Sequence, residues 1–352
     1  MKRIPSAFSV ASLRAAHRRS KPGRRRFRAR VAAGVFVLAA SLLHAAGFPE
    51  AGISNGLLTA KLYLPDAATG YYRATRFDWS GQIPDLVYKG HSYFGEWNPA
   101  PYDPKLHDAI TGPVEEFLTN NAGLGYAEAK AGGTFIKIGV GVIRKPDEPR
   151  FRQFETYEIV DPGKWTVKKH ADSVEFTQIV ADPSSGYAYR YTKIVRLLKG
   201  KPSMVLEHRL KNTGKKLIES DVYEHNFYMI DKQPTGPDVV VKFPFEVHAT
   251  QDLHGLAETR GKQLVYLKEL SPGGQSAQSN LTGFGSDPKD YDITEENLKT
   301  GAGVRQTSDR PVARINYWSI RSTACPEAYI HMSIPPGQEF TWKINYDFYT
   351  TK

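Results

Sequence analysis

Aromatic and polar side chains alternate in several segments of this sequence, and together they could bind a ligand rich in hydroxyl groups. Arg76 and Asp78 flank Phe77 and are followed by Trp79, and His91 lies in a turn just before further aromatic residues. Sugars present apolar C–H faces, which stack on aromatic rings, and hydroxyls, which need hydrogen-bonding partners. Arg76 could bind a hydroxyl or a carboxylate, and Asp78 a pair of hydroxyls. Composition alone favours the alternative that these aromatics belong to an ordinary core. Arg76 and Asp78 could instead form a local salt bridge, and His91 could be an exposed turn residue.

A histidine and several carboxylic acids could transfer protons. His225 alternates with Tyr223 and Phe227, and Glu116 and Glu327 are candidate carboxylates. An imidazole and a carboxylate can act as acid and base near neutral pH when their surroundings tune each pKa. The competing interpretation makes His225 a half-buried, hydrogen-bonded histidine and Glu327 a surface carboxylate beside a turn.

Other chemistries lack their motifs in the sequence. No His-x-His or His-Glu-x-x-His spacing occurs, and Cys325 is the single cysteine, so a metal site is not predicted. Gly-rich phosphate loops, dinucleotide fingerprints and Gly-x-Ser-x-Gly elbows do not occur either. We therefore predict no cofactor. Cys325 is expected to be a buried apolar residue, and an internal disulfide is excluded.

The residues that could do chemistry must be positioned by strands. Buried-type and polar residues alternate over 187–197, 203–211 and 342–349, and Gly, Pro and Asn turns join such segments. Period-2 alternation between turns is typical of antiparallel hairpins. Short helices are expected near 112–118 and 294–298, and an irregular loop over 272–290. The pattern predicts an all-β fold, a large antiparallel β-sandwich.

The first 46 residues have the three parts of an export signal. They carry eleven Lys and Arg and no Asp or Glu, then an apolar run from Val31 to Leu43 and a small-residue end at Ala45-Ala46. Arg24-Arg25-Arg26-Phe27 fits the core of a twin-arginine signal, and a plain secretory leader is the alternative. We expect residues 1–46 to be cleaved, residues 47–352 to form a single domain, and the product to be periplasmic or secreted. An uncleaved leader would be its only membrane contact.

Removal of this leader changes the charge of the protein. The whole chain has 47 Lys and Arg against 37 Asp and Glu, a formal net charge of +10. Residues 47–352 keep 36 basic and 37 acidic residues, a net charge of −1. A nucleic-acid partner, which needs a basic face on a folded domain, is therefore not expected. The sequence leaves the oligomeric state open.

The stretch 203–227 resembles the galactose mutarotase-like, or aldose 1-epimerase-like, superfamily. There a strand that ends in an Asn-Thr turn leads to a second strand with a His, a polar residue and an aromatic, here His225-Asn226-Phe227. Segment 335–342 resembles the family's Pro-Gly-Glu-type turn into the last strand, and 325–330 the segment with its acidic catalytic residue. The resemblance covers residues 157–349. The family's Gly-Arg-x-x-Asn-Arg segment and early His motif are missing, which indicates an exported branch of its own.

The resemblance implies a mutarotase-like sandwich and an acid/base ring opening of a cyclic sugar. Glu327 would be the base and His225 the acid, both projecting into one concave face. The residues expected to bind the carbohydrate, monomeric or oligomeric, are Arg76, Asp78, Trp79, His91, Glu116, Tyr223 and Asn226.

Two other functions remain open on the same type of sandwich. A hydrolase would need two carboxylates across a cleft, for which Glu115, Glu116 and Glu327 are candidates. A polysaccharide lyase could use Arg76, Tyr223 and His225. A carbohydrate-binding protein that keeps the cleft without catalysis is the third possibility.

Overall fold

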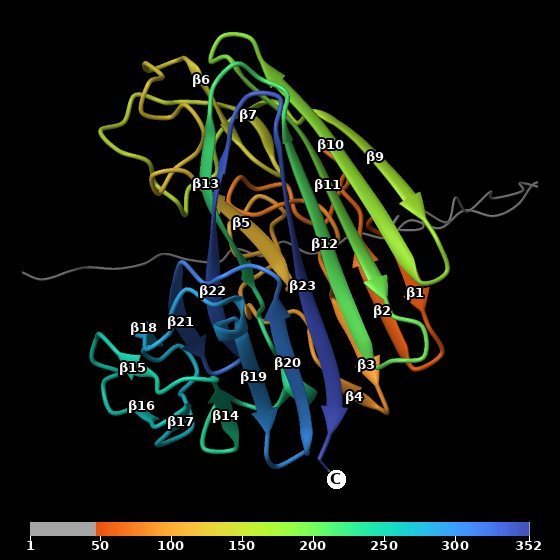
Figure 1. Cartoon of the computed structure of the whole chain (residues 1–352), viewed down its shortest axis with the longest axis vertical. Coiled ribbons are helices and arrows are strands. Elements are labelled where there is room, and N and C mark those ends of the chain that lie inside the picture. The colour runs from red at the N-terminus through yellow and green to blue at the C-terminus, as the bar shows by residue number, and fades with distance from the viewer. Residues whose placement is uncertain (1–46, 352) are drawn as a thin grey trace, which may run out of the picture. The chain divides into compact units, whose positions relative to one another are not determined.

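Alternating buried and exposed residues form long strands in the computed structural model, which describes residues 47–351 (Figure 1). The predicted leader lies outside the described residues. All strand pairs are antiparallel, and no α-helix occurs over 47–351. Two 3-10 turns are present, Ile230–Lys232 and Pro288–Asp290. The all-β prediction is confirmed. No helix within these described residues is long and apolar enough to cross a membrane.

Two large sheets dominate. The strands of the ten-stranded sheet are, in spatial order, β16 (Ala257–Arg260), β17 (Gln263–Tyr266), β14 (Val239–Lys242), β19 (Asp292–Asn297), β20 (Ala302–Ser308), β23 (Glu339–Thr350), β12 (Ser203–Asn212), β11 (Tyr187–Leu197), β10 (Ser173–Asp182) and β9 (Lys164–Lys169). Those of the six-stranded sheet are β15 (His248–Ala249), β18 (Ala277–Thr282), β21 (Arg314–Ile320), β22 (Thr323–Ile334), β13 (Ile218–His225) and β5 (Val114–Leu118).

Two smaller sheets come from the first part of the chain. One has four strands, β1 (Glu50–Ser54), β2 (Leu58–Tyr63), β3 (Asp85–Tyr88) and β4 (His91–Ser92). The other has three, β6 (Thr134–Lys137), β7 (Gly141–Arg144) and β8 (Ile159–Asp161).

The inner faces of the two large sheets bury the main core. On β23, Trp342, Ile344, Tyr346 and Phe348 are all buried, as their alternation with polar residues predicts. Phe117 of β5 lies across the interface, with its ring centroid 6.1 Å from that of Trp342. The six-stranded sheet therefore turns one face toward this core.

Two segments predicted as short helices are strands. Residues 114–118 form β5, in which Glu115 and Glu116 point to opposite faces and are both fully buried. Lys193 neutralises Glu115 and Arg76 pairs with Glu116, so tertiary contacts outweigh the poor strand propensity of two adjacent acids. Residues 292–297 form β19, whose period-2 burial includes a buried Glu295. The predicted loop over 272–290 likewise contains the regular strand β18.

Candidate active site

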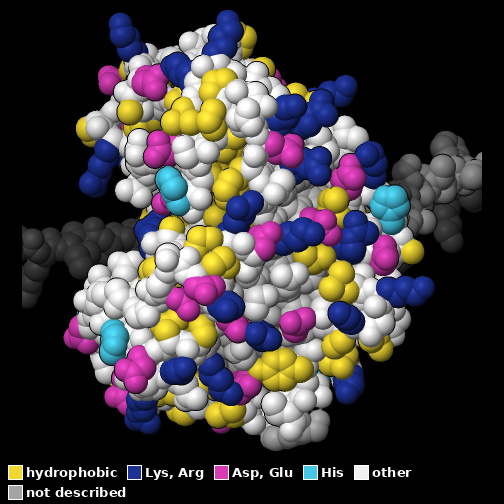
Figure 2. Space-filling view, viewed as in Figure 1, with side chains coloured by type: hydrophobic (Ala, Val, Ile, Leu, Met, Phe, Trp, Pro, Cys, Tyr) yellow, Lys and Arg dark blue, Asp and Glu magenta, His cyan; other side chains and the backbone are white. Residues whose placement is uncertain are grey.

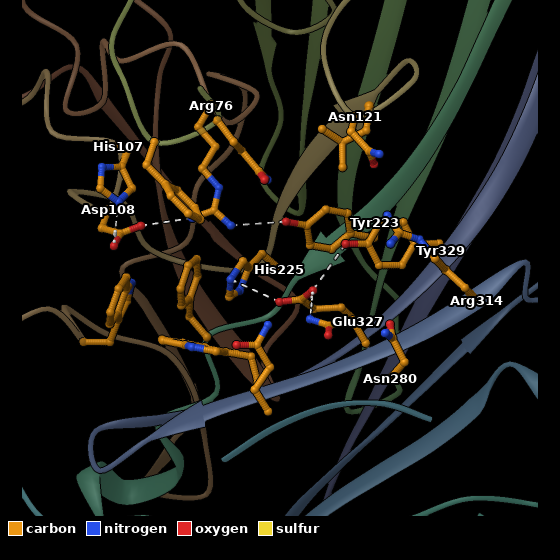
Figure 3. Close-up of a pocket in the computed structure, with 18 residues that line it drawn as sticks. Arg76, His107, Asp108, Asn121, Tyr223, His225, Asn280, Arg314, Glu327 and Tyr329 are labelled. Atoms are coloured by element: carbon orange, nitrogen blue, oxygen red, sulfur yellow. Dashed lines mark hydrogen bonds and ion pairs between the residues drawn. The ribbon is translucent and has the colours of Figure 1, made fainter. Parts of the chain in front are cut away.

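An open cavity of about 490 Å³ lies on the outer face of the six-stranded sheet (Figure 3). This volume falls within the roughly 300–1,000 Å³ of typical small-molecule sites. Side chains of β13, β21, β22 and β18 line the cavity, and loops add Arg76, the segment around Trp97 and His107, and Gln153 with Phe154.

Strand register arranges the lining side chains in rows that run across the sheet. Tyr223 of β13 lies opposite Tyr329 of β22, and the same antiparallel register places His225 opposite Glu327. Asn316 of β21 pairs with Glu327, and Asn280 of β18 pairs with Asn316. Since every second residue of a strand faces the same side, this row is presented to the cavity as a unit.

His225 and Glu327 are in direct contact. Nε2 of His225 lies 3.3 Å from Oε1 of Glu327, and both side chains are nearly buried. Oε2 of Glu327 accepts a hydrogen bond from Nδ2 of Asn316 at 2.8 Å and a longer one, 3.4 Å, from the Tyr329 hydroxyl. Nδ1 of His225 has no hydrogen-bond partner among residues 47–351. The pair can therefore exchange a proton.

Burial shifts the pKa values of Glu327 and His225 in the directions that favour the neutral form of each side chain. It raises the pKa of Glu327 to about 7, although the Asn316 hydrogen bond and the charge of Arg76 act in the opposite direction. Burial, and then the positive charge of Arg76, lower the pKa of His225 well below its usual range. Below about pH 7 the pair therefore holds one proton, which rests mainly on Glu327.

Aromatic rings fix the imidazole in place. The His225 ring stacks on Phe227 with centroids 3.7 Å apart and planes 8° apart, and Trp97 stacks on Phe227 at 4.6 Å. Trp318 meets His225 edge-on at 5.6 Å. Phe227 has a φ of 46°, a conformation that is rare for a bulky residue and that tends to occur at functional sites. Its backbone N–H donates to Sγ of Cys325 at 3.2 Å.

Arg76 forms the opposite wall and is held by several partners. Its Nε donates to Oε2 of Glu116 at 3.0 Å, one terminal nitrogen donates to Asp108 at 3.1 Å, and the other reaches the Tyr223 hydroxyl at 3.4 Å. Burial would lower the pKa of Arg76, but Glu116, Tyr223 and Asp108 outweigh it and raise this pKa. Glu116 has a lowered pKa because Arg76 and Lys137 outweigh its burial. The wall is thus a hydrogen-bonded network in which Arg76 and Glu116 are ionised.

The structure brings part of the predicted site together. His225, Glu327, Arg76 and Tyr223 all line the cavity, and Glu116 lies directly behind Arg76 and Tyr223.

Four predicted sugar-binding residues lie elsewhere, so these assignments are corrected. Asp78 is buried and accepts a hydrogen bond from the Ser80 hydroxyl, and Trp79 donates to the Ala74 carbonyl in an aromatic core. His91 pairs with Asp231 at 2.8 Å outside the cavity. Asn226 follows His225 by one residue and therefore faces the core, where it bonds to Gln306 and Tyr346.

Several lining residues were not singled out from the sequence. On β21, Arg314, Asn316 and Trp318 face the cavity, and on β18 Gln278 and Asn280 do so. The alternation of these polar residues with buried apolar ones would have revealed the β21 group, but not which side the ligand occupies.

A second charged cluster lies inside the sandwich, away from the cavity. Glu115, His208 and Glu224 place one potential metal ligand each within 4.8 Å of one another. Lys193 already occupies this cluster, with Nζ 2.5 Å from Oε2 of Glu115. His208, predicted to be a core histidine, is buried, bonded to Glu115 and stacked on Trp342. The ammonium of Lys193 thus already balances the negative charge that would otherwise attract a metal cation to this cluster.

Comparison with solved structures identifies the fold. A GalM/aldose epimerase homologue from C. elegans superposes with a TM-score of 0.52 at 14% identity, covering 86% of this chain and 99% of the other. A galactose mutarotase-like protein from Lactobacillus casei gives 0.51 at 12% identity, with coverages of 85% and 100%. One from Clostridium acetobutylicum gives 0.51 at 13%, covering 85% and 95%. No family model and no curated protein matches the sequence.

The sheets therefore form a galactose mutarotase-like sandwich, as the resemblance of residues 157–349 predicts, and the shared architecture includes the N-terminal part. At 12–14% identity this likeness establishes the fold, and function has to be argued from the site.

Proposed function

We propose that this protein is an aldose 1-epimerase-like isomerase that interconverts the anomers of a sugar by opening and reclosing its ring. The contact between His225 and Glu327 at the floor of the cavity carries the proposal. It is an acid/base pair, with one member of strongly raised pKa and one of strongly lowered pKa, which is typical of catalytic sites.

The chemistry needs one base and one acid beside a single carbon atom. Ring opening removes the proton of the anomeric hydroxyl, forms the carbonyl, breaks the bond from the anomeric carbon to the ring oxygen, and protonates that oxygen. Glu327 as carboxylate takes the first proton, and His225 as imidazolium gives the second. Reclosure on the other face reverses both transfers. Proton transfer by positioned groups typically contributes about 10²–10⁴-fold.

Below about pH 7 the reactive pair carries one proton that can pass between Glu327 and His225. With the sugar unbound this proton rests mainly on Glu327, and its movement to His225 gives the carboxylate and imidazolium that the reaction uses. Arg76 and the amide of Asn316 are polar partners for the other hydroxyls, while Trp97, Phe154 and Trp318 offer ring surfaces.

The site supports a hydrolase or a lyase less well. Glu116, a candidate second carboxylate behind the cavity lining, has a lowered pKa, is fully buried and is bonded to Arg76, so it is unsuited to donate a proton. Asp108, which lines the cavity, is paired with Arg76 and His107. Tyr223, the candidate lyase base, donates to Glu116 and has a pKa raised well above its usual value by burial. Sugar binding without turnover is the second candidate, because among residues 47–351 Nδ1 of His225 has no hydrogen-bond partner that would fix which ring nitrogen carries the proton.

Polarimetry of purified protein with D-glucose, D-galactose, D-mannose and D-xylose tests the proposal. We expect mutarotation of at least one sugar to be accelerated in proportion to protein concentration. Binding of a sugar without acceleration would favour the binding role, and neither binding nor acceleration would contradict both.

We also propose that the protein acts in the periplasm or after secretion, on the basis of the leader composition of residues 1–46. Cell fractionation with N-terminal sequencing of the product tests this. A product in the cytoplasm that retains Met1 would contradict it.

A further inference from the structure

A second cavity of about 360 Å³ adjoins the first. Gln278, Asn280 and Asn316 line both, so the two cavities form one continuous cleft. Beyond these shared residues the second cavity is lined by Gln251 and Gln275, among others. The cleft is therefore longer than the site that holds His225 and Glu327.

The cleft runs along a row of side chains that crosses four neighbouring strands of the six-stranded sheet. His225, Glu327, Asn316 and Asn280 lie on the consecutive strands β13, β22, β21 and β18. Three strand spacings of about 4.8 Å span about 14 Å, which is longer than one pyranose ring. A ligand whose reacting sugar meets His225 would continue along this row toward β18.

The floor of the second cavity carries several side-chain amides, and hydrogen bonds within the protein orient one of them, that of Gln251. Oε1 of Gln251 accepts hydrogen bonds from the Asn280 backbone N–H at 2.6 Å and from the Ser279 hydroxyl at 3.0 Å. This fixes the side chain and leaves its NH₂ group without a protein partner over 47–351. Gln278 and Gln275 have no side-chain hydrogen bond in that range either. Amides can both donate and accept hydrogen bonds, and they therefore suit neutral hydroxyl groups.

The outer face of the ten-stranded sheet carries many charged side chains, whereas the β18 strand in the floor of the second cavity does not. The outward residues of β11 and β12 include Arg190, Arg196, Arg209 and Lys211, and charged side chains are scattered over the face that carries β10, β11, β12 and β23 in Figures 1 and 2. On β18 the outward residues are Gln278, Asn280 and Thr282, all uncharged. The only acidic or basic side chains that line the second cavity, those of Asp252 and His254, lie 3.6 Å apart.

We infer that the substrate is a reducing oligosaccharide with an uncharged unit in the second cavity. Its reducing-end sugar lies against His225 and Glu327. The next unit hydrogen-bonds in the second cavity to Gln251 and Gln275, and to Gln278 and Asn280 of β18. The inference rests on the proposed function, since it assigns the reacting end to the acid/base pair.

Calorimetric titration of the full-length protein tests the inference. The probes are D-glucose, D-galactose, D-mannose and D-xylose, and the α- and β-1,4-linked di- and trisaccharides of each. For the sugar that binds, we expect at least tenfold tighter binding of its disaccharide. Gln251→Ala and Gln275→Ala should each reduce this ratio at least threefold. Gln275 is exposed and makes no side-chain hydrogen bond within residues 47–351, so Gln275→Ala guards against a folding effect. Arg209→Ala, on the outer face of β12, is the matched control and should leave the ratio unchanged.

The outcomes separate the two proposals. A monosaccharide that is bound or mutarotated, with no gain from the second unit, overturns the oligosaccharide inference and leaves the isomerase proposal standing. A chain-length gain that survives both glutamine substitutions also overturns the inference. Failure to bind or mutarotate any of these sugars overturns both.

Discussion

Replacement of Lys193 by methionine tests how strongly the sandwich depends on one ion pair in its interior. Nζ of Lys193 lies 2.5 Å from Oε2 of Glu115 and 3.0 Å from the Ser80 carbonyl oxygen, and both charged side chains are fully buried. Loss of one partner of a buried pair costs about 3–5 kcal/mol, because the other charge remains buried without compensation. We expect Lys193→Met to lower the free energy of unfolding by that amount.

The loss should depend on pH. In the native protein, Lys193 and then His208 outweigh burial and lower the pKa of Glu115 to about 2. Glu115 therefore adds stability above its unfolded pKa of about 4.5, and this is lost only as the pH falls toward 2. Without Lys193, burial raises this pKa above the unfolded value, so folding favours the protonated acid. The deficit of the variant should then grow as the pH rises from 5 to 8.

Urea denaturation at pH 5 and pH 8 measures both effects. Lys168→Met is the matched control, because Lys168 makes a similar 2.7 Å pair with Glu175 but is 61% exposed, so its loss should cost about 1 kcal/mol or less. Adding Glu115→Gln to Lys193→Met should recover most of the stability. A loss below about 1 kcal/mol for Lys193→Met at pH 8, or a loss independent of pH, would refute the reasoning.

Three further changes test the site. Gly112→Ala places a Cβ 2.1 Å from the Asn226 carbonyl oxygen beside His225, so we expect a stability loss of about 1–3 kcal/mol and reduced mutarotation. Gly52→Ala is the control, because Gly52 has open space around it, and it should change neither stability nor mutarotation. Arg76→Gln should weaken sugar binding at least tenfold and destabilise the fold, because Glu116 loses its main cation; unchanged binding by calorimetry would contradict this. Mutarotation should be present below about pH 7 and lost above it, because Glu327 then gives up the proton of the pair; a pH–rate profile that rises through pH 7 would be inconsistent with the one-proton pair.

The sequence predicts the strands better than it predicts which side chains share a site. Alternation located β11, β12 and β23, because their inward residues are almost all apolar. It failed at β5, where burial of Glu115 and Glu116 depends on Lys193 and Arg76, which are distant in sequence.

The site depends on register and on sheet order, which local patterns do not contain. A shift of one residue separates His225 in the cavity from Asn226 in the core, and the family motif alone does not distinguish these two faces. The resemblance did single out His225 and Glu327, which the fold places in contact. Gln278 and Asn280 were hidden in a segment that reads as a loop, since Gly and Ser surround it.

The most direct test of the central claim is the rate of anomer exchange measured by NMR. The accelerated sugar would be compared in the native protein, His225→Ala and Glu327→Gln, with calorimetry to show that each variant still binds it. Since each variant removes one member of the acid/base pair, we predict that either lowers the catalysed exchange rate by about 10²–10⁴-fold. Exchange at the native rate in a folded variant that binds the sugar would contradict the assignment of His225 and Glu327.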